Sequence, residues 1–274
     1  MSCHLPPATR TQSMRKMAHL PAGRTVRFQA RQLAISRGDD TTVTMTPHTG
    51  SKLAELEPAG MAPPEAGLQQ RKSAETRITI LDAAVDCLAS HGYARTTTQL
   101  IAKVAKVSRG AMLHHYATKQ ELIESVTDYA FYRHMEEFVR AVRELSEVER
   151  TRRNVGILID WRLYLSREYS AYLELTVAAR TDAELKATFI PKARRHDRVW
   201  RDELARVFPE WASDPELLSR SRRLVQSVMS GMVLNRDIWE DPAMEKSLLA
   251  FLSHALVQVR DGALDWPDGT DLDI

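Results

Sequence analysis

The stretch that decides the fold is Thr96-Thr-Thr-Gln-Leu-Ile-Ala-Lys-Val-Ala-Lys-Val-Ser-Arg-Gly-Ala-Met-Leu-His-His-Tyr116. Thr96 and Gln99 have the spacing of a capping box, so we expect a helix to begin at Thr96. The apolar residues that follow have the spacing of a helix with one buried face: Leu100, Ile101, Val104 and Ala105. Residues 105–107 then form a turn.

Ser108 is a good N-cap for a second, short helix that runs to about His115. A helix of that length is not stable alone in water, so it needs neighbours. The flanking sequence offers apolar partners on both sides: Ile78, Leu81, Ala84, Val85, Leu88, Leu122, Val126 and Tyr129. We therefore predict a compact three-helix unit. The short helix from Ser108 to His115 presents a polar, basic surface of the kind that enters a DNA groove.

Two further helices frame this unit. The first opens at Ser73 or Glu75 and ends near Gly92, which is well placed as a left-handed C-cap residue. The other begins at a second capping box, Thr118 to Glu121, and runs to about Leu145.

The sequence from Thr76 to Val126 matches a known pattern at many positions in one register. The matching segments are Ile80–Val85, Gly92–Tyr93, Thr96–Thr97, Ile101–Ala102, Val107–Gly110, and Lys119, Glu121 and Leu122. On these residues the chain resembles the N-terminal domain of the TetR family of bacterial transcriptional regulators. The resemblance implies an all-α fold, in which a helix-turn-helix DNA-binding domain precedes a helical domain for ligand binding and dimerisation.

The resemblance also implies the residues that contact DNA. They are Thr97, Thr98, Lys106, Ser108, Arg109, Gly110, Ala111, His114, His115 and Lys119. Thr97 and Lys119 would each bind a DNA phosphate, and the free backbone amides at the helix start beside Lys119 would bind the same phosphate.

Two positions depart from the family. Lys106 stands where the family usually has Gly, and a left-handed conformation there costs roughly 1 kcal/mol; Leu113 replaces a phosphate-binding Tyr.

Composition excludes several classes of protein. The chain has 274 residues, of which 43% are hydrophobic, and no run approaches the roughly 18 apolar residues of a membrane helix. We expect a soluble, cytoplasmic protein without a membrane partner. Cys3 and Cys87 are the two cysteines, so we expect neither a disulfide framework nor a metal site, and we expect Cys87 to be buried. Phosphate loops, nucleophile elbows and metalloprotease motifs are missing, so we predict no enzyme activity and no cofactor.

Charge is unevenly distributed although the net charge is only +2. Residues 71–120 carry eight Lys and Arg against three Asp and Glu. A basic segment on a slightly acidic remainder is typical of a protein that contacts nucleic acid at one end.

Residues 1–70 contain many prolines and glycines and no sustained periodicity, so we predict a disordered extension. One explanation is a translation start assigned too far upstream, with Met45 or Met61 nearer the true one. The other is a basic arm that adds non-specific DNA affinity, since residues 1–38 carry seven bases and no acid. At the other end, we read residues 264–274 as an acidic tail.

Residues 121–263 are predicted to be helical throughout, following the DNA-binding domain at 71–120. Helix starts are indicated at Ser146, Thr181, Ser213 and Asp241. The apolar-periodic segments lie at about 152–167, 170–180, 182–208, 214–238 and 242–262.

The last two helices carry more apolar surface than one core requires, which indicates a second partner. In the family, the corresponding helices pair across a two-fold axis, so we predict a homodimer that binds a palindromic operator. The interface residues we expect are Leu224, Val228, Met232, Leu248, Leu252 and Leu256, with Gly231 allowing close approach.

Aromatic residues gather on the middle helices, where the resemblance implies an effector cavity. The expected lining is Trp161, Tyr164, Tyr172, Phe189 and Trp200, around a small molecule whose identity the sequence does not give. The favoured function is a ligand-responsive repressor. The alternatives are an effector-independent activator or nucleoid-type factor and, more remotely, a helical-bundle enzyme or interaction protein.

Overall fold

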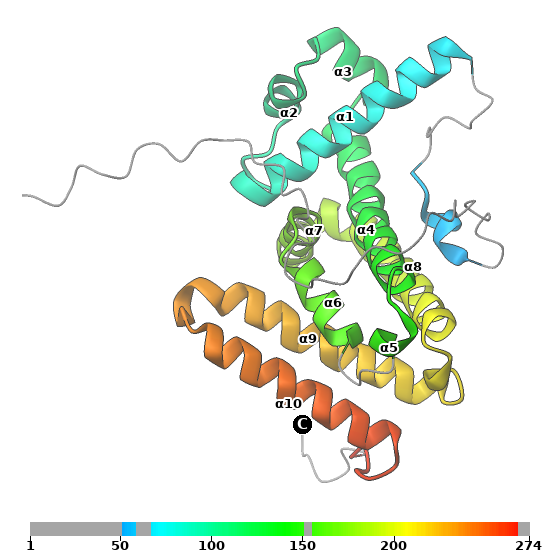
Figure 1. The fold of residues 1–274 in the computed structure, drawn as a ribbon. Helices are drawn as coiled ribbons and strands as arrows, with labels where there is room; N and C mark the ends of the chain where they lie inside the picture. The colour runs from blue at the N-terminus through cyan, green and yellow to red at the C-terminus, as the bar shows by residue number, and fades with distance from the viewer. Residues whose placement is uncertain (1–50, 59–66, 151–154, 268–274) are drawn as a thin grey trace, which may run out of the picture. The chain divides into compact units, whose positions relative to one another are not determined.

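The computed structural model describes residues 51–58, 67–150 and 155–267, and every regular element in these ranges is helical (Figure 1). This confirms the predicted all-α fold. Of the helices in these ranges, none is both long and apolar enough to cross a bilayer. The elements are η1 (Lys52–Leu56), α1 (Leu68–His91), α2 (Thr98–Ala105), α3 (Arg109–His115), α4 (Lys119–Arg143), α5 (Glu147–Arg150), α6 (Val155–Tyr164), α7 (Arg167–Ala178), α8 (Ala183–Val207), η2 (Pro209–Trp211), α9 (Pro215–Trp239) and α10 (Pro242–Arg260).

Helices α1, α2 and α3 form the predicted helix-turn-helix unit together with the start of α4. Their shared core is buried almost completely and includes Ile80, Leu81, Leu88, Ile101, Met112, Leu122 and Val126. Cys87 is buried as expected. Val104 is not: its side chain is 41% exposed, so our placement of it in the core was wrong.

Several helix starts lie one residue from the predicted caps. The Thr97 hydroxyl, not that of Thr96, accepts from the Leu100 amide at 3.1 Å. Thr96 is instead fully buried and its hydroxyl donates to the Gly92 carbonyl. Asp182 and Asp214 likewise cap α8 and α9 in place of the neighbouring Thr181 and Ser213. The carboxylate of each aspartate accepts a hydrogen bond from the backbone amide three residues later in the chain. Helix α1 begins earlier than predicted, at Leu68.

Helix α4 connects the DNA-binding unit to the body. Its first half, including Val126 and Tyr129, belongs to the core around α1 to α3. Its second half, including Met135 and Phe138, packs with α6 and α8 in a second core. One continuous helix therefore joins the two regions.

Part of the predicted disordered extension is ordered. Within 51–58, η1 buries Leu53 and Leu56 against α4 and α8. The buried carboxylate of Glu203 accepts from the Ser51 hydroxyl and the Lys52 amide, each at 2.8 Å. The remainder of the predicted extension up to residue 66 and the final residues of the acidic tail lie outside the described residues.

Helices α9 and α10 lie side by side at the C-terminal end of the fold (Figure 1). Three of the predicted interface residues, Met232, Leu252 and Leu256, are buried inside the protomer. They pack in one core with residues of α6 and α7, so in this protomer they are not exposed to a partner. The surface of these helices instead exposes Leu224, Leu234, Ile238, Trp239, Met244 and Phe251.

Candidate nucleic-acid interface and effector cavity

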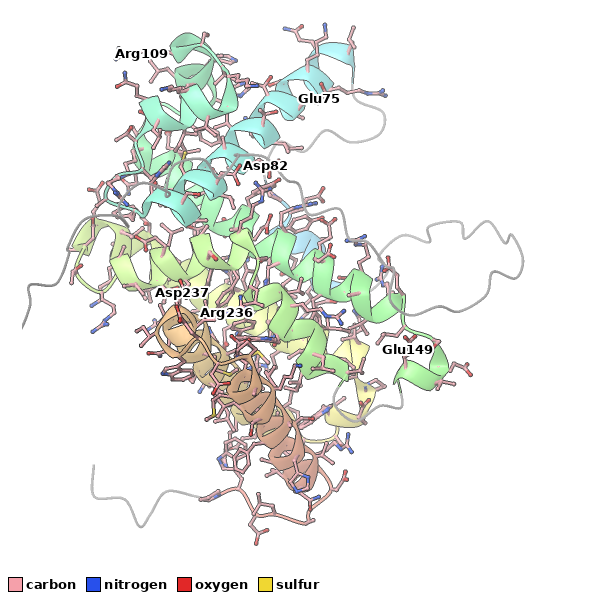
Figure 2. The ribbon with its side chains drawn as sticks, turned by 60° about the vertical axis from the view of Figure 1, so that its left-hand side comes forward. Glu75, Asp82, Arg109, Glu149, Arg236 and Asp237 are labelled. Atoms are coloured by element: carbon pink, nitrogen blue, oxygen red, sulfur yellow. The ribbon has the colours of Figure 1, made fainter. Side chains whose placement is uncertain are left out.

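The outer surface of α3 is the candidate DNA-reading surface. Met112 turns into the core and fixes the helix, whose start is capped by Ser108 accepting from the Ala111 amide at 3.1 Å. Arg109 lies at the outer end of α3 and projects from it (Figure 2). Of the predicted contact residues, those exposed are Thr97, Lys106, Ser108, Arg109, Gly110 and His114, and those partly exposed are Thr98, Ala111, His115 and Lys119. The structure therefore brings the predicted set to one end of the molecule.

The turn between α2 and α3 adopts the expected strained conformation. Lys106 has φ 56° and ψ 34°, which is left-handed, and it is exposed. Leu113, 47% exposed, adds an apolar side chain to the same helix. This surface therefore offers a cation in the turn but no hydroxyl at position 113.

Lys119 has a partner within the protein. Its ammonium donates to the Tyr93 carbonyl at 3.2 Å and lies 4.2 Å from the centre of the Tyr93 ring. Burial lowers the pKa of Lys119, and Asp182 opposes this shift. One of its three donors is therefore used in holding the end of α1 to the start of α4, which the sequence did not indicate.

The two histidines of α3 are in contact, with ring centroids 5.3 Å apart. Burial lowers the pKa of His115, and the charge of Arg77 and the neighbouring His114 add to this effect. The lowered pKa favours the neutral imidazole of His115, which can accept a hydrogen bond at this surface.

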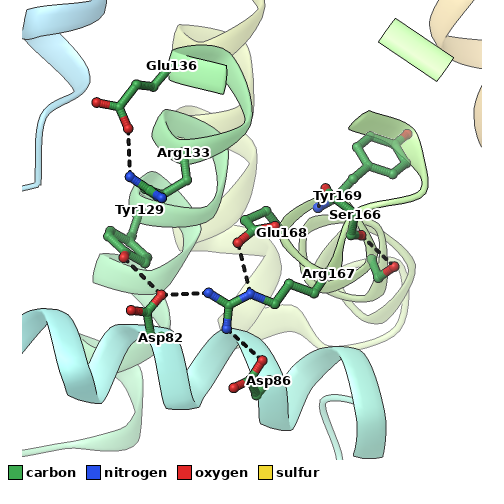
Figure 3. Close-up of polar contacts among 10 residues, drawn as sticks. Asp82, Asp86, Tyr129, Arg133, Glu136, Ser166, Arg167, Glu168 and Tyr169 are labelled. Atoms are coloured by element: carbon green, nitrogen blue, oxygen red, sulfur yellow. Dashed lines mark hydrogen bonds and ion pairs between the residues drawn. The ribbon is translucent and has the colours of Figure 1, made fainter. Parts of the chain in front are cut away.

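An ionic joint connects the DNA-binding unit to the body (Figure 3). Arg167, the first residue of α7, pairs with Asp82 at 2.8 Å and Asp86 at 2.7 Å, both on α1. The Tyr129 hydroxyl of α4 donates to the same Asp82 carboxylate at 3.0 Å. Three helices therefore meet at Asp82.

A second contact lies at the far end of α1. The Glu174 carboxylate on α7 accepts from the Tyr93 amide at 2.6 Å, just after Gly92. Gly92 has φ 76°, and a Cβ there would lie 3.1 Å from Glu174. The predicted glycine is thus needed both for its conformation and for the approach of α7.

A cavity of about 730 Å³ lies between α4, α6, α7, α8 and α9. Four of the predicted aromatic residues line it: Tyr164, Tyr172, Phe189 and Trp200. Trp161 does not; it is buried in the core that α6 shares with α9 and α10. A smaller cavity of about 360 Å³ lies on the other side of Trp200 and Arg222, which line both.

The buried polar groups beside these cavities were not predicted from the sequence. His134 and Asp160 approach to 4.0 Å, and within the described ranges His134 Nδ1 and Asp160 Oδ1 have no hydrogen-bond partner. Burial lowers the pKa of His134 to about 4. Burial raises the pKa of Asp160 to about 7 against the opposing effect of Arg222. Asp160 interrupts the apolar run from Ile157 to Trp161, which was a usable signal, whereas His134 lies beside Arg133 and close to Glu136 and had none.

A further polar cluster lies in the wall of the larger cavity. His196 Nε2 is 2.8 Å from the Asp128 carboxylate, its Nδ1 is 3.3 Å from the Tyr172 hydroxyl, and its ring stacks on Phe131. Lys192 also pairs with Asp128. These contacts link α4, α7 and α8 around the cavity.

Comparison with known proteins agrees with this arrangement. Residues 80–126 match the family described as bacterial regulatory proteins, tetR family. The chain is 28% identical over 196 residues to an uncharacterised helix-turn-helix transcriptional regulator of Mycobacterium tuberculosis, a match that covers 70% of this chain and 97% of the relative. It is 30% identical over 135 residues to the transcriptional repressor AcnR of Corynebacterium efficiens, covering 49% of this chain and 67% of the repressor.

A solved structure supports the fold. A transcriptional regulator from a Rhodococcus species superposes with a TM-score of 0.51 at 19% identity, over 68% of this chain and 96% of that one. The proteins matched here are regulators, and none is named as an enzyme. With the exposed reading helix and the matched N-terminal unit, these comparisons establish that the chain belongs to the TetR family of bacterial transcriptional regulators.

Proposed function

We propose that this DNA-binding regulator is a ligand-responsive repressor that binds a palindromic operator as a homodimer. The observation that carries the DNA-reading role is the exposed, basic surface of α3, fixed by the inward-facing Met112. A repressor of this kind occupies its operator and blocks transcription. The similarity to a protein named as a repressor supports this direction of regulation.

In the proposed complex, α3 enters the major groove and Arg109 reads a base. Arginine is suited to this role because its guanidinium can donate two hydrogen bonds to guanine. Thr97 and the first amides of α4 lie at helix starts, where free N–H groups favour a phosphate. Lys119 contributes its charge there, with two donors left beside the bond to Tyr93.

The experiment compares two variants on a site selected from random duplexes and on random DNA. Arg109→Ala is expected to lose roughly 1 to 3 kcal/mol on the selected site and much less on random DNA. Lys119→Ala is expected to weaken binding to both and to lower the salt slope by about one unit. Equal losses on both DNAs for both variants would contradict these roles.

The homodimer is proposed to form through exposed and partly exposed residues of α9 and α10. Leu224, Val228, Gly231 and Ile238 recur at helical spacing on α9, and Met244, Leu248, Phe251 and Ala255 do so on α10. Phe251 is 73% exposed and Ile238 is 76% exposed, which is costly for large apolar side chains. A second copy would cover them and supply the second reading helix.

Sedimentation tests this interface. Phe251→Glu is expected to convert the dimer to monomer and to reduce operator affinity, because each half-site then binds separately. Lys246→Glu, on an exposed position of the same helix, serves as the control and should leave the dimer intact. A wild-type protein that is monomeric at micromolar concentration would contradict the proposal.

The ligand response is proposed to pass through α4 and α7. Both helices line the larger cavity and both contact the DNA-binding unit, α7 through Arg167 and Glu174. A ligand that prefers one position of these helices shifts the population of the DNA-binding state. Removing the joint with Arg167→Ala should weaken the effect of ligand on operator affinity more than it changes affinity without ligand.

A further inference from the structure

The larger cavity has a strongly positive lining. Among the described residues that form it, five are arginines and one is a carboxylate. The arginines are Arg194, Arg198, Arg201, Arg222 and Arg223, all on α8 and α9, and the carboxylate is Asp197. A cleft lined by one sign of charge attracts ligands of the opposite sign.

Arg222 is the deepest of these cations. Its side chain is 10% exposed; it pairs with Asp197 at 2.5 Å and donates to the Gln226 amide oxygen at 2.8 Å. Its Nε is buried without a partner in the described structure. Asp197 is 30% exposed and is shared with Arg223 at 4.0 Å. A buried guanidinium with one shared carboxylate has donor capacity left for another anion.

The cavity also has an aromatic wall. Phe131, Tyr164, Tyr172, Phe189 and Trp200 line it, and all are buried or nearly so. Aromatic walls favour flat, apolar ligand bodies, through burial and ring stacking. The cavity thus presents a flat apolar half and a cationic half.

We propose that the larger cavity binds a small organic anion with a flat aromatic body, whose anionic group is held by Arg222 in competition with Asp197. This inference rests on the proposed ligand response and names the class of ligand. Because Asp197 lies on α8 and Arg222 on α9, an anion that takes the place of Asp197 also releases a tie between these two helices.

A matched pair of fluorescent dyes tests the charge requirement. 1-Anilinonaphthalene-8-sulfonate carries an anionic group on an aromatic body, and N-phenyl-1-naphthylamine has the same body without it. We expect the wild-type protein to bind the sulfonate at least ten times more tightly than the neutral dye, with one dye per protomer. Equal affinity for the two dyes would overturn the proposal.

Variants of α9 test the role of Arg222. Arg222→Gln should weaken sulfonate binding at least tenfold and change binding of the neutral dye less than twofold, which also shows that the cavity is still formed. Arg220→Gln is the matched control, because Arg220 is exposed and pairs with Glu216 outside the cavity. If Arg222→Gln fails to fold, the affinities of the wild-type protein for the two dyes still show whether the cavity prefers an anionic ligand.

A variant that fills the larger cavity tests the location of the site. Ala193 lines the larger cavity and does not line the smaller one. Ala193→Phe should remove binding of both dyes while the variant still binds the selected operator. Unchanged dye binding would contradict the location. Failure of the wild-type protein to bind any selected DNA would contradict the proposed function, whereas equal dye affinities would contradict the ligand class alone.

Discussion

The DNA-binding unit and the larger cavity are built in opposite ways. The unit comes from one continuous segment, its helix starts are capped by Thr97, Ser108 and Thr118, and its core is closed. The cavity is assembled from five separated helices, and His134 and Arg222 in its lining keep buried polar atoms without partners among the described residues; Asp160, which lines the smaller cavity, keeps another. Capped helix starts around a closed core favour one shape, although the buried Tyr116 hydroxyl there also lacks a partner among the described residues. This contrast supports the proposal that the first region reads DNA and the second binds a ligand.

The largest expected effect is at Asp160. Burial raises its folded pKa to about 7, above its unfolded value, so the folded protein binds more protons between about pH 4 and 7 and loses stability as pH rises. Asp160→Asn removes this contribution. The free energy of unfolding of the variant minus that of the wild type should increase by roughly 3 to 4 kcal/mol from pH 4 to pH 7. Chemical unfolding of both proteins at each pH measures this difference.

His134 provides the internal check on this measurement. Its folded pKa is lowered by burial to about 4, so its contribution has the opposite sign: stability rises with pH up to its unfolded pKa. That contribution is present in both proteins, and because His134 lies 4.0 Å from Asp160 the difference also contains any change in the pKa of His134. A difference between variant and wild type that is flat across pH would show that Asp160 ionises normally, and the contrast between the two regions would weaken.

The next effect concerns the closed core of the DNA-binding unit. Ile101 is fully buried, so Ile101→Ala should destabilise the protein by about 3 kcal/mol through lost burial and a cavity. Val104, on the same helix but 41% exposed, is the control, and Val104→Ala should cost under about 0.5 kcal/mol. Urea titration distinguishes the two; similar losses would mean that α2 is packed differently.

The smallest effect is in the turn. Lys106 has a positive φ, so Lys106→Gly should relieve strain and stabilise the unit by about 1 kcal/mol. The same change removes a cation from the proposed DNA surface and should weaken binding to all sequences. A variant that is less stable than the wild type would show that the strain is offset by contacts of the Lys106 side chain.

The sequence predicted the DNA-binding unit well because the relevant signals are local. Ser108, Thr118 and Gly92 fulfil roles that depend on neighbours a few residues away. The caps at Thr96, Thr181 and Ser213 were missed by one residue because two capping residues stand side by side in each case, and local pattern does not choose between them.

The cavity and the outer faces of α9 and α10 were less predictable. Both helices carry apolar residues on more than one side, so periodicity did not show that Met232 faces inward and Leu234 outward. The pairing of Arg222 with Asp197 and the approach of His134 to Asp160 join separate helices. Such contacts depend on tertiary packing and have no local signature.

The most direct test of the account is a footprint of the wild-type protein on duplexes selected from a random pool. If α3 of each protomer reads a major groove, the protein will protect a palindrome whose half-sites are separated by about one helical turn, 10 to 10.5 base pairs, or a multiple of it. Arg109→Ala should lose the protection at unchanged protein concentration. A pool that yields no common sequence, or a site protected equally by the Arg109→Ala variant, would contradict the claim that this helix reads DNA.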